Sequence, residues 1–293
     1  NYRSPAEVFA LAAQVVSREF PEADLPEAVR STGVQPELLA GPADALLPTV
    51  VERAADLLGT LAANITGTGA SFGFRNDQAL TIGSATAQDS ATATNGITTA
   101  DGNIRVATLG SGAGDAITVV NNVSAGNNGA IDLRAGGTAG DIAINGATLR
   151  STNGAGAGSG TVQLVAGRDI STSTANSGAV VTPEIRTTGS VLLQAAGTIG
   201  ADGQRIEIQE AATLASRAGG DTWLRKLGST HADLTLGSVA AINPSASFGG
   251  AVSSLDGLVT TANDGRIALV NETGAMMKQV IEAVSHVHLV IND

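Results

Sequence analysis

Gly160-Thr161-Val162-Gln163-Leu164-Val165-Ala166-Gly167 and Gly189-Ser190-Val191-Leu192-Leu193-Gln194-Ala195 are two copies of one phrase. In each copy a glycine is followed, at every second position, by a β-branched residue, an aliphatic residue and alanine. Looser copies begin at Gly102 and Gly129. Alternation with a period of two is typical of a β-strand, whose successive side chains point to opposite faces. The phrase therefore predicts a set of similar strands.

The phrase returns at a nearly constant interval. Its β-branched position falls at Ile104, Ile131, Val162 and Val191, in steps of 27, 31 and 29 residues, and similar steps lead to Thr222 and Val252. A second strand-like phrase lies between successive copies and begins at Ile117, Ile142, Ile170, Ile206, Leu234 and Ile267. Each unit of about 30 residues is thus predicted to hold two short strands joined by turns rich in Gly, Asn and Ser.

Self-similarity at a fixed period predicts a solenoid, because one coil buries few side chains alone and must stack on its neighbours. The alternation places Ile131, Leu133 and Ala135 on the inner face together. We expect the copies in the other coils to continue these columns. Aromatic residues are 2% of the chain, which favours a thin aliphatic core. A β-sandwich is the competing interpretation, but it predicts no constant phase.

The first 63 residues differ from the rest. Ser4-Pro5-Ala6-Glu7 and Thr49-Val50-Val51-Glu52 each form a capping box, and the second opens an apolar stripe that extends to about Ala63. We predict a helical cap or spacer over 1–63, with a partner-binding helix as the alternative. The β-solenoid is predicted over 64–293, with its best-registered repeats over 102–255.

Strand candidates outside the main repeat are Gln78–Ile82, Gly96–Thr99 and the run His286–Ile291. A strand–turn–strand continuation is expected over 275–291. Because the chain starts at Asn1 and stops within a strand-like run, we expect it to be a piece of a larger protein.

Charge and composition exclude several classes of protein. The formal charge is −11 and the pI is near 4.6, which disfavours binding to nucleic acid or to an anionic membrane through net charge. The chain has no cysteine, so disulfides and thiolate sites are excluded. No apolar run reaches the roughly 18 residues needed for a membrane span, and no transmembrane segment is predicted.

The phrases resemble the repeats of filamentous haemagglutinin-like adhesins, which are giant bacterial surface proteins. The segments that carry the resemblance are Gly160–Ile170 and Gly189–Ile199, with Gly129–Ile142 as a looser copy. The resemblance implies a right-handed parallel β-helix and a role in adhesion, as a matrix element or as a spacer. It also implies an extracellular or cell-surface location, with other protein chains, a host or partner cell surface, or polysaccharide as partners. The repeat of about 30 residues is longer than the family's coils, and the family's secretion domain is not recognisable here.

Three groups of residues are candidate sites. Asp115, Asp141, Asp169 and Asp233 precede the second phrase, so a stacked carboxylate column could bind Ca²⁺, although we expect each Asp to begin a turn by bonding its own backbone. His286 and His288 share a strand face and could bind Zn²⁺ only with a third ligand such as His231. Trp223, beside Arg225 and Lys226, could bind sugar if it is exposed, but we expect a loop to cover it.

No residue is assigned to catalysis, to a cofactor or to a metal. A polysaccharide lyase-like β-helix is the enzyme alternative, but it needs an acidic metal cluster, a basic residue and aromatic platforms that the sequence does not group together. We therefore expect a non-enzymatic structural or adhesive module. A structural subunit docked in a larger assembly through the N-terminal helices is a further alternative.

Overall fold

A computed structural model describes residues 59–86, 92–110, 115–154, 156–175, 182–228, 233–243, 245, 248–262 and 264–272, together with the backbone of 276–278, 281–282 and 286–291. All of these residues belong to one compact unit, which comprises Leu57–Ala87 and Ala91–Asp293. The helices predicted within 1–58 lie outside the described residues.

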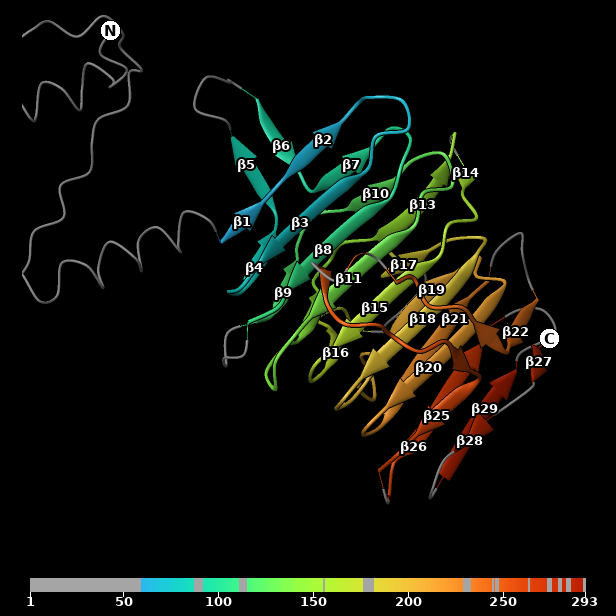
Figure 1. Ribbon diagram of the computed structural model, residues 1–293. Helices are drawn as coiled ribbons and strands as arrows, with labels where there is room; N and C mark the ends of the chain where they lie inside the picture. The colour runs from blue at the N-terminus through green and yellow to red at the C-terminus, as the bar shows by residue number, and fades with distance from the viewer. Residues whose placement is uncertain are drawn as a thin grey trace, which may run out of the picture. The chain divides into compact units, whose positions relative to one another are not determined.

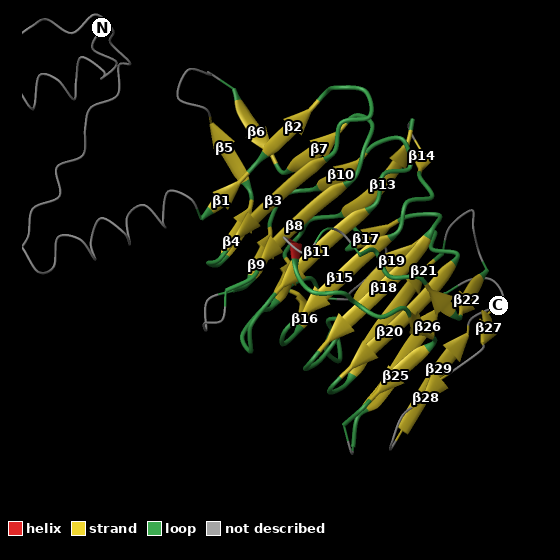
Figure 2. Ribbon diagram, viewed as in Figure 1, coloured by secondary structure: helices red, strands yellow, loops and turns green. Residues whose placement is uncertain are grey.

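The described chain is mainly β, with almost no helix, and three parallel sheets contain most of its strands (Figure 2). Sheet I consists of β3 (Phe72–Asn76), β8 (Ile104–Thr108), β11 (Ile131–Ala135), β15 (Val162–Ala166), β18 (Ser190–Ala195), β20 (Thr213–Ala218), β22 (Leu234–Leu236), β25 (Leu258–Thr260), β27 (Met276–Lys278) and β28 (Ile281–Glu282). Sheet II consists of β1 (Thr60–Leu61), β4 (Leu80–Ile82), β9 (Ile117–Val119), β12 (Ile142–Ile144) and β16 (Ile170–Thr172).

Sheet III consists of β2 (Ala63–Ile65), β7 (Ile97–Thr99), β10 (Val123–Ala125), β13 (Leu149–Asn153), β17 (Ile185–Arg186), β19 (Ile206–Gln209), β21 (Thr222–Leu227), β26 (Arg266–Asn271) and β29 (His286–Ile291), with β14 (Gly156–Ala157) antiparallel to β13. Two antiparallel pairs stand apart: β5 (Ser84–Thr86) with β6 (Ala93–Asn95), and β23 (Ser238–Val239) with β24 (Leu255–Asp256).

The chain visits the sheets in rotation. From β8 in sheet I it passes to β9 in sheet II, to β10 in sheet III and back to β11 in sheet I, so that strands stack one behind another along the molecule (Figure 1). This order is consistent with the predicted parallel β-helix and differs from the β-sandwich alternative. The prediction of two strands per unit was wrong, because each such circuit has three. The missed strands of sheet III, such as Val123–Ala125, are short and mix polar with apolar residues.

The inward column of sheet I confirms the predicted register. Its members, which are partners on four successive strands, are Ile104, Ile131, Val162 and Val191. All four are fully buried, as are Leu133 and Leu164 one step along the strands. Burial of each such side chain contributes roughly 1.5–3 kcal/mol. The aliphatic columns therefore form a core without any fully buried aromatic side chain in the described residues.

The glycine that opens the phrase is required by the close approach of adjacent coils. A Cβ atom at Gly160 would lie 2.1 Å from the carbonyl oxygen of Gly129, and one at Gly129 would lie 2.2 Å from that of Gly102. Gly189 meets the carbonyl oxygen of Ser159 at 2.1 Å in the same way. Any larger residue would push the two backbones apart here, so the glycines permit the close stacking.

Beyond Val191 the predicted register is wrong. The partner of Val191 in the next strand is Leu214, only 23 positions on, rather than Thr222. Thr222 lies in β21 of sheet III, and Val252 lies outside the three sheets. The phrase around Leu214 was missed because it lacks the opening glycine and has Leu in place of a β-branched residue. Its ending, Ala218-Gly219, matches the endings Ala135-Gly136 and Ala166-Gly167 of two other copies.

The predicted register of the second phrase is also correct in the first coils and wrong in the later ones. Ile117, Ile142 and Ile170 are partners in sheet II, as predicted. The column then continues through an isolated bridge to Ile199 instead of Ile206. Ile206, Leu234 and Ile267 belong to other ladders, because the coils shorten after residue 191 and the strand of sheet II shrinks to single bridges.

The strand predictions outside the main repeat are confirmed, whereas the predicted end of the N-terminal helical segment is wrong. The candidates at 78–82 and 96–99 contain β4 and β7, and β27, β28 and β29 confirm the strand–turn–strand continuation. The helix expected to extend to about Ala63 was wrong at its end, because β1 and β2 occupy Thr60–Leu61 and Ala63–Ile65. Gly59 precedes these strands and weakens a helix at that point.

Candidate functional site: an arm across the outer face of sheet I

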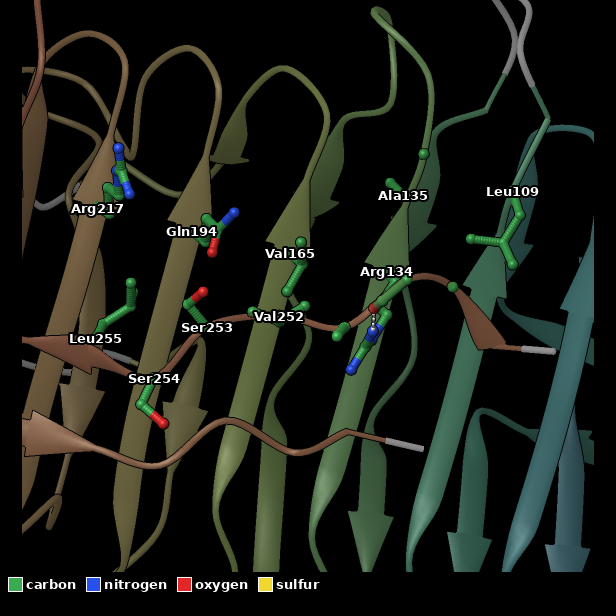
Figure 3. A pocket seen from close by; sticks show the side chains of 14 residues that line it. Leu109, Arg134, Ala135, Val165, Gln194, Arg217, Val252, Ser253, Ser254 and Leu255 are labelled. Carbon is green, nitrogen blue, oxygen red and sulfur yellow. Dashed lines mark hydrogen bonds between the residues drawn. The ribbon is translucent and has the colours of Figure 1, made fainter. Parts of the chain in front are cut away.

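Residues 237–257 leave the sheets between β22 and β25 and form an arm across the outer face of sheet I. At its base β23 pairs with β24 in antiparallel register. Further out, the Asn243 side chain accepts a hydrogen bond from Val252 N at 2.8 Å and donates one to Val252 O at 3.0 Å. The arm reaches as far as Phe248, whose ring would lie 2.9 Å from a Cβ atom at Gly73 in β3. It thus crosses the strands of several coils (Figure 3).

A buried polar cluster fastens the arm to the sheet. Asp132, Arg134 and Gln163 point outward from β11 and β15, yet they are only 2%, 4% and 0% exposed. Arg134 Nε donates to both Asp132 carboxylate oxygens at 3.0 Å, and Gln163 Nε2 donates to Asp132 Oδ1 at 2.8 Å. These contacts hold the three side chains in fixed orientations beneath the arm.

The same cluster binds backbone atoms of both limbs of the arm. Arg134 Nη1 donates to the Gly250 carbonyl at 2.8 Å, and Nη2 donates to the Ile242 carbonyl. Gln163 accepts from Ile242 N at 2.7 Å and donates to Ile242 O at 2.9 Å. The guanidinium and the amide therefore attach the backbone of Ile242, which is half-buried, and of Gly250, which is exposed, to the sheet.

Burial dominates the electrostatics of this cluster. It raises the pKa of Asp132 above its usual value, although the hydrogen bonds and charge of Arg134 and the amide of Gln163 act in the opposite direction. An ion pair out of water is stable only while its partners and hydrogen bonds stay in place. The arm keeps the cluster buried, and the hydrogen bonds of the cluster hold the arm on the sheet.

An apolar contact completes the attachment near the base of the arm. Leu192 and Ala215 point outward from β18 and β20, where a polar surface would be usual, and pack against Val239 and Leu255 of the arm. All four side chains are buried. The outer face of sheet I is therefore a second, smaller core.

A groove remains open beside the arm. Arg134, Val165, Gln194 and Arg217 are partners along successive strands, and Figure 3 shows their side chains on one face next to the returning limb. Two adjoining hollows of about 370 and 590 Å³ share Val165, Gln194 and Arg217. Within the described chain their lining has two arginines and no carboxylate. Arg217 is exposed and Gln194 is half-buried, so the groove can offer an anionic or hydroxylated ligand a cation and an amide.

The predicted aspartate column is only partly formed. Asp115, Asp141 and Asp169 precede successive strands of sheet II, whereas Asp233 precedes β22 of sheet I and is not in the column. The Asp141 and Asp169 carboxylates bond to the next coil instead of to their own turn, which corrects the expected geometry. Asp141 Oδ1 accepts from Asp169 N at 3.1 Å, and Asp169 Oδ1 accepts from Thr198 N at 2.6 Å.

Arg168 and backbone groups of the next coil bind the Asp141 and Asp169 carboxylates, whereas Asp115 Oδ2 is buried without a hydrogen-bond partner. Arg168 donates two hydrogen bonds to Asp141 and thereby lowers the pKa of that carboxyl. In the part of the chain that the structure describes, no three carboxylate or histidine side chains come close enough together to hold a metal ion. The column is thus a set of ties between coils.

The histidine and tryptophan candidates do not form the sites that the sequence suggested in the described residues. His286 and His288 lie in β29, but their side chains, and His231 altogether, fall outside the described residues. Trp223 is half-buried, and the Arg205 guanidinium carbon lies 5.9 Å from the centre of its ring. Lys226 does not flank the ring on the surface, as the sequence suggested, because it points inward and is 1% exposed.

A second buried polar chain lies along sheet III. Glu184 Oε1 accepts a hydrogen bond from Thr172 Oγ1 at 2.7 Å, and its Oε2 accepts one from Glu207 N at 2.8 Å. Glu207 Oε1 accepts a hydrogen bond from Arg225 Nη1 at 2.8 Å, and Arg225 Nε donates one to Glu272 Oε1. Burial raises the pKa of Glu184 to about 7, partly offset by these hydrogen bonds.

The cluster under the arm was not predicted from the sequence. Asp132, Arg134 and Gln163 occupy outward positions of the phrase, where polar residues are ordinary on a solvated strand. The available signal was at neighbouring outward positions, because Leu192 and Ala215 are apolar there. Such residues on an outer face indicate that another element covers it.

The described residues include no helix that is both long and apolar enough to cross a bilayer. No protein-family model, curated protein or solved structure matches this chain.

Proposed function

We propose that this chain is a structural and adhesive module of a large bacterial surface protein, built as a right-handed parallel β-helix. The observation that carries the proposal is the rotation of the chain through three parallel sheets around aliphatic columns. Such a stack buries the repeated residues and leaves its outer faces free to vary, which suits a spacer that presents contact surfaces. The resemblance of the phrases to filamentous haemagglutinin-like adhesins supports the same role.

In this proposal the module is extracellular or displayed on the bacterial surface, and it acts without catalysis, cofactor or metal. Its partners are other protein chains, a host or partner cell surface, or a polysaccharide. The groove beside the arm is the proposed contact site, because Arg217 and Gln194 offer a cation and an amide there. Its described lining has no carboxylate, which disfavours the lyase alternative and its acidic metal cluster.

An adhesion assay tests the proposal. Fluorescent beads carrying the full chain are incubated with cultured epithelial cells and with surfaces coated with acidic polysaccharide such as alginate. We expect the beads to be retained above albumin-coated beads, and Arg217→Glu to reduce retention. Arg266→Glu makes the same change in charge on the outer face of sheet III and is expected to retain binding. Failure of the wild-type beads to bind any of these surfaces would contradict an adhesive role.

Two further measurements separate the alternatives. Incubation with alginate or polygalacturonate, followed by ultraviolet absorbance of unsaturated products, tests the lyase hypothesis; product formation would overturn the non-enzymatic role. Co-purification of partner chains with the full chain and with a chain that lacks residues 1–56 tests docking through the N-terminal segment. These residues, with 88–90, make up the other of the two units of the chain. Equal recovery of partner chains would exclude docking through that segment.

A further inference from the structure

Two polar side chains interrupt an aliphatic column at the C-terminal end of sheet III. Ile208, Lys226 and Asn271 are partners on β19, β21 and β26 and occupy one inward column. Lys226 is 1% exposed and Asn271 is 0% exposed. The inward neighbours one step earlier, Leu224 and Leu269, belong to the aliphatic core. A lysine and an asparagine therefore face each other across adjacent strands inside the protein.

The register brings the two reactive groups within reach. Adjacent strands of a sheet lie about 4.8 Å apart, and the side chains of directly paired residues point the same way. The four-carbon stem of lysine is flexible, so its amine can fold back to the short side chain of the paired asparagine. We propose that Lys226 and Asn271 join in a spontaneous amide cross-link between β21 and β26.

The reaction balances without any other reactant. The neutral Lys226 Nζ attacks the Asn271 side-chain carbonyl carbon, Cγ, and forms the Nζ–Cγ bond. A proton passes from Nζ to the departing Nδ2, the Cγ–Nδ2 bond breaks, and ammonia leaves. The product is a secondary amide, with no oxidation or reduction.

The surroundings favour the nucleophile. Burial lowers the pKa of the Lys226 ammonium and so increases the neutral amine, although the charges of Asp233 and Glu210 act in the opposite direction. Glu210 is only 8% exposed, whereas Asp233 is exposed. Glu210 Oε1 accepts a hydrogen bond from Arg186 Nη2 at 3.1 Å, so this carboxylate is already paired, and the proton passes directly from Nζ to Nδ2.

Mass spectrometry of the full wild-type chain tests the cross-link. After denaturation, we expect its mass to be lower than that of the sequence by one ammonia, and a tryptic digest to contain one branched peptide joining Lys226 to Asn271. Lys226→Met and Asn271→Leu should each have the mass of their sequence. These variants need not fold for the wild-type result to decide the matter.

Succinimide formation at an Asn–Gly pair such as Asn145–Gly146 also releases ammonia. The branched peptide is therefore the deciding observation. An unchanged wild-type mass after prolonged incubation, or ammonia loss without the branched peptide, would overturn the proposal. The outcome is independent of the adhesion assay, since the cross-link concerns only the interior of the coils.

Discussion

Replacing Arg134 with methionine tests whether the buried cluster fastens the arm. Arg134→Met keeps an unbranched apolar stem but removes the guanidinium that pairs with Asp132 and binds the Ile242 and Gly250 carbonyls. Asp132, 2% exposed, would keep its carboxylate without that cation. Removing one partner of a buried pair typically costs about 3–5 kcal/mol.

We expect this loss to appear mainly in the arm. The coils keep their ladders and aliphatic columns. The arm loses its two hydrogen bonds from Arg134 and retains those between Gln163 and Ile242, together with the apolar contact of Val239 and Leu255 with sheet I. Opening of the arm would expose Asp132 to water and relieve the uncompensated charge. A loss of about 3 kcal/mol corresponds to an increase in the open fraction of more than a hundredfold, at about 1.4 kcal/mol per tenfold change.

Hydrogen–deuterium exchange with mass spectrometry measures this directly. Peptides from 237–257 should exchange much faster in Arg134→Met, with peptides from β11 and β15 nearly unchanged. Arg217→Met is the matched control, because Arg217 lies in the same outward row but is exposed, and its effect should stay within about 0.5 kcal/mol. Adding Asp132→Leu to Arg134→Met should restore part of the protection. Unchanged exchange of the arm in Arg134→Met would refute this account.

Two other predictions concern the coils. Because burial raises the folded-state pKa of Glu184 from 4.5 to about 7, the folded state retains a proton that the unfolded chain releases, so stability should fall by about 3 kcal/mol as pH rises from 4.5 through 7. Glu184→Gln imitates the protonated acid and should flatten this part of the stability–pH curve in urea titrations; an unchanged slope would contradict the assignment. Gly160→Ala should destabilise the fold by about 1–3 kcal/mol in the same assay, because its Cβ would meet a backbone carbonyl. Gly156→Ala, where the nearest contact is an ordinary 3.7 Å, should be close to neutral, and equal effects of the two would argue against the close approach.

The sequence predicted the fold best where neighbouring coils have similar lengths. Between Ile104 and Val191 the phrase keeps its glycine and its β-branched residue in every copy, and it keeps its alanine in all but the first, which has Thr108 at that position. After Val191 the next coil shortens, and constant spacing points to Thr222 instead of Leu214. Backbone pairing tolerates coils of different length because turns absorb the difference, so a fixed period is a poor guide beyond the regular region.

The candidate site could not be predicted in the same way. Asp132 and Gln163 are ordinary outward residues until a segment from more than 70 positions away covers them. Nothing in the local alternation identifies the covering segment, and 237–257 has neither a strong strand pattern nor a helical one. Only the apolar outward pair, Leu192 and Ala215, indicated a covered face, and that signal does not specify what covers it.

The arm also has a consequence for the order of folding. Contacts between neighbouring coils join residues about 30 positions apart; for example, Ala130 N donates a hydrogen bond to the Asn103 side chain, 27 positions away. The hydrogen bond from Arg134 to the Gly250 carbonyl, in contrast, joins residues 116 positions apart. Loop-closure entropy favours the nearer contacts, so the coils can assemble one on another before the arm docks. During synthesis the arm emerges after the strands that it covers. Leu192 and Ala215 would therefore remain exposed on the growing stack of strands until the arm docks. During that interval their apolar surface can associate with other chains.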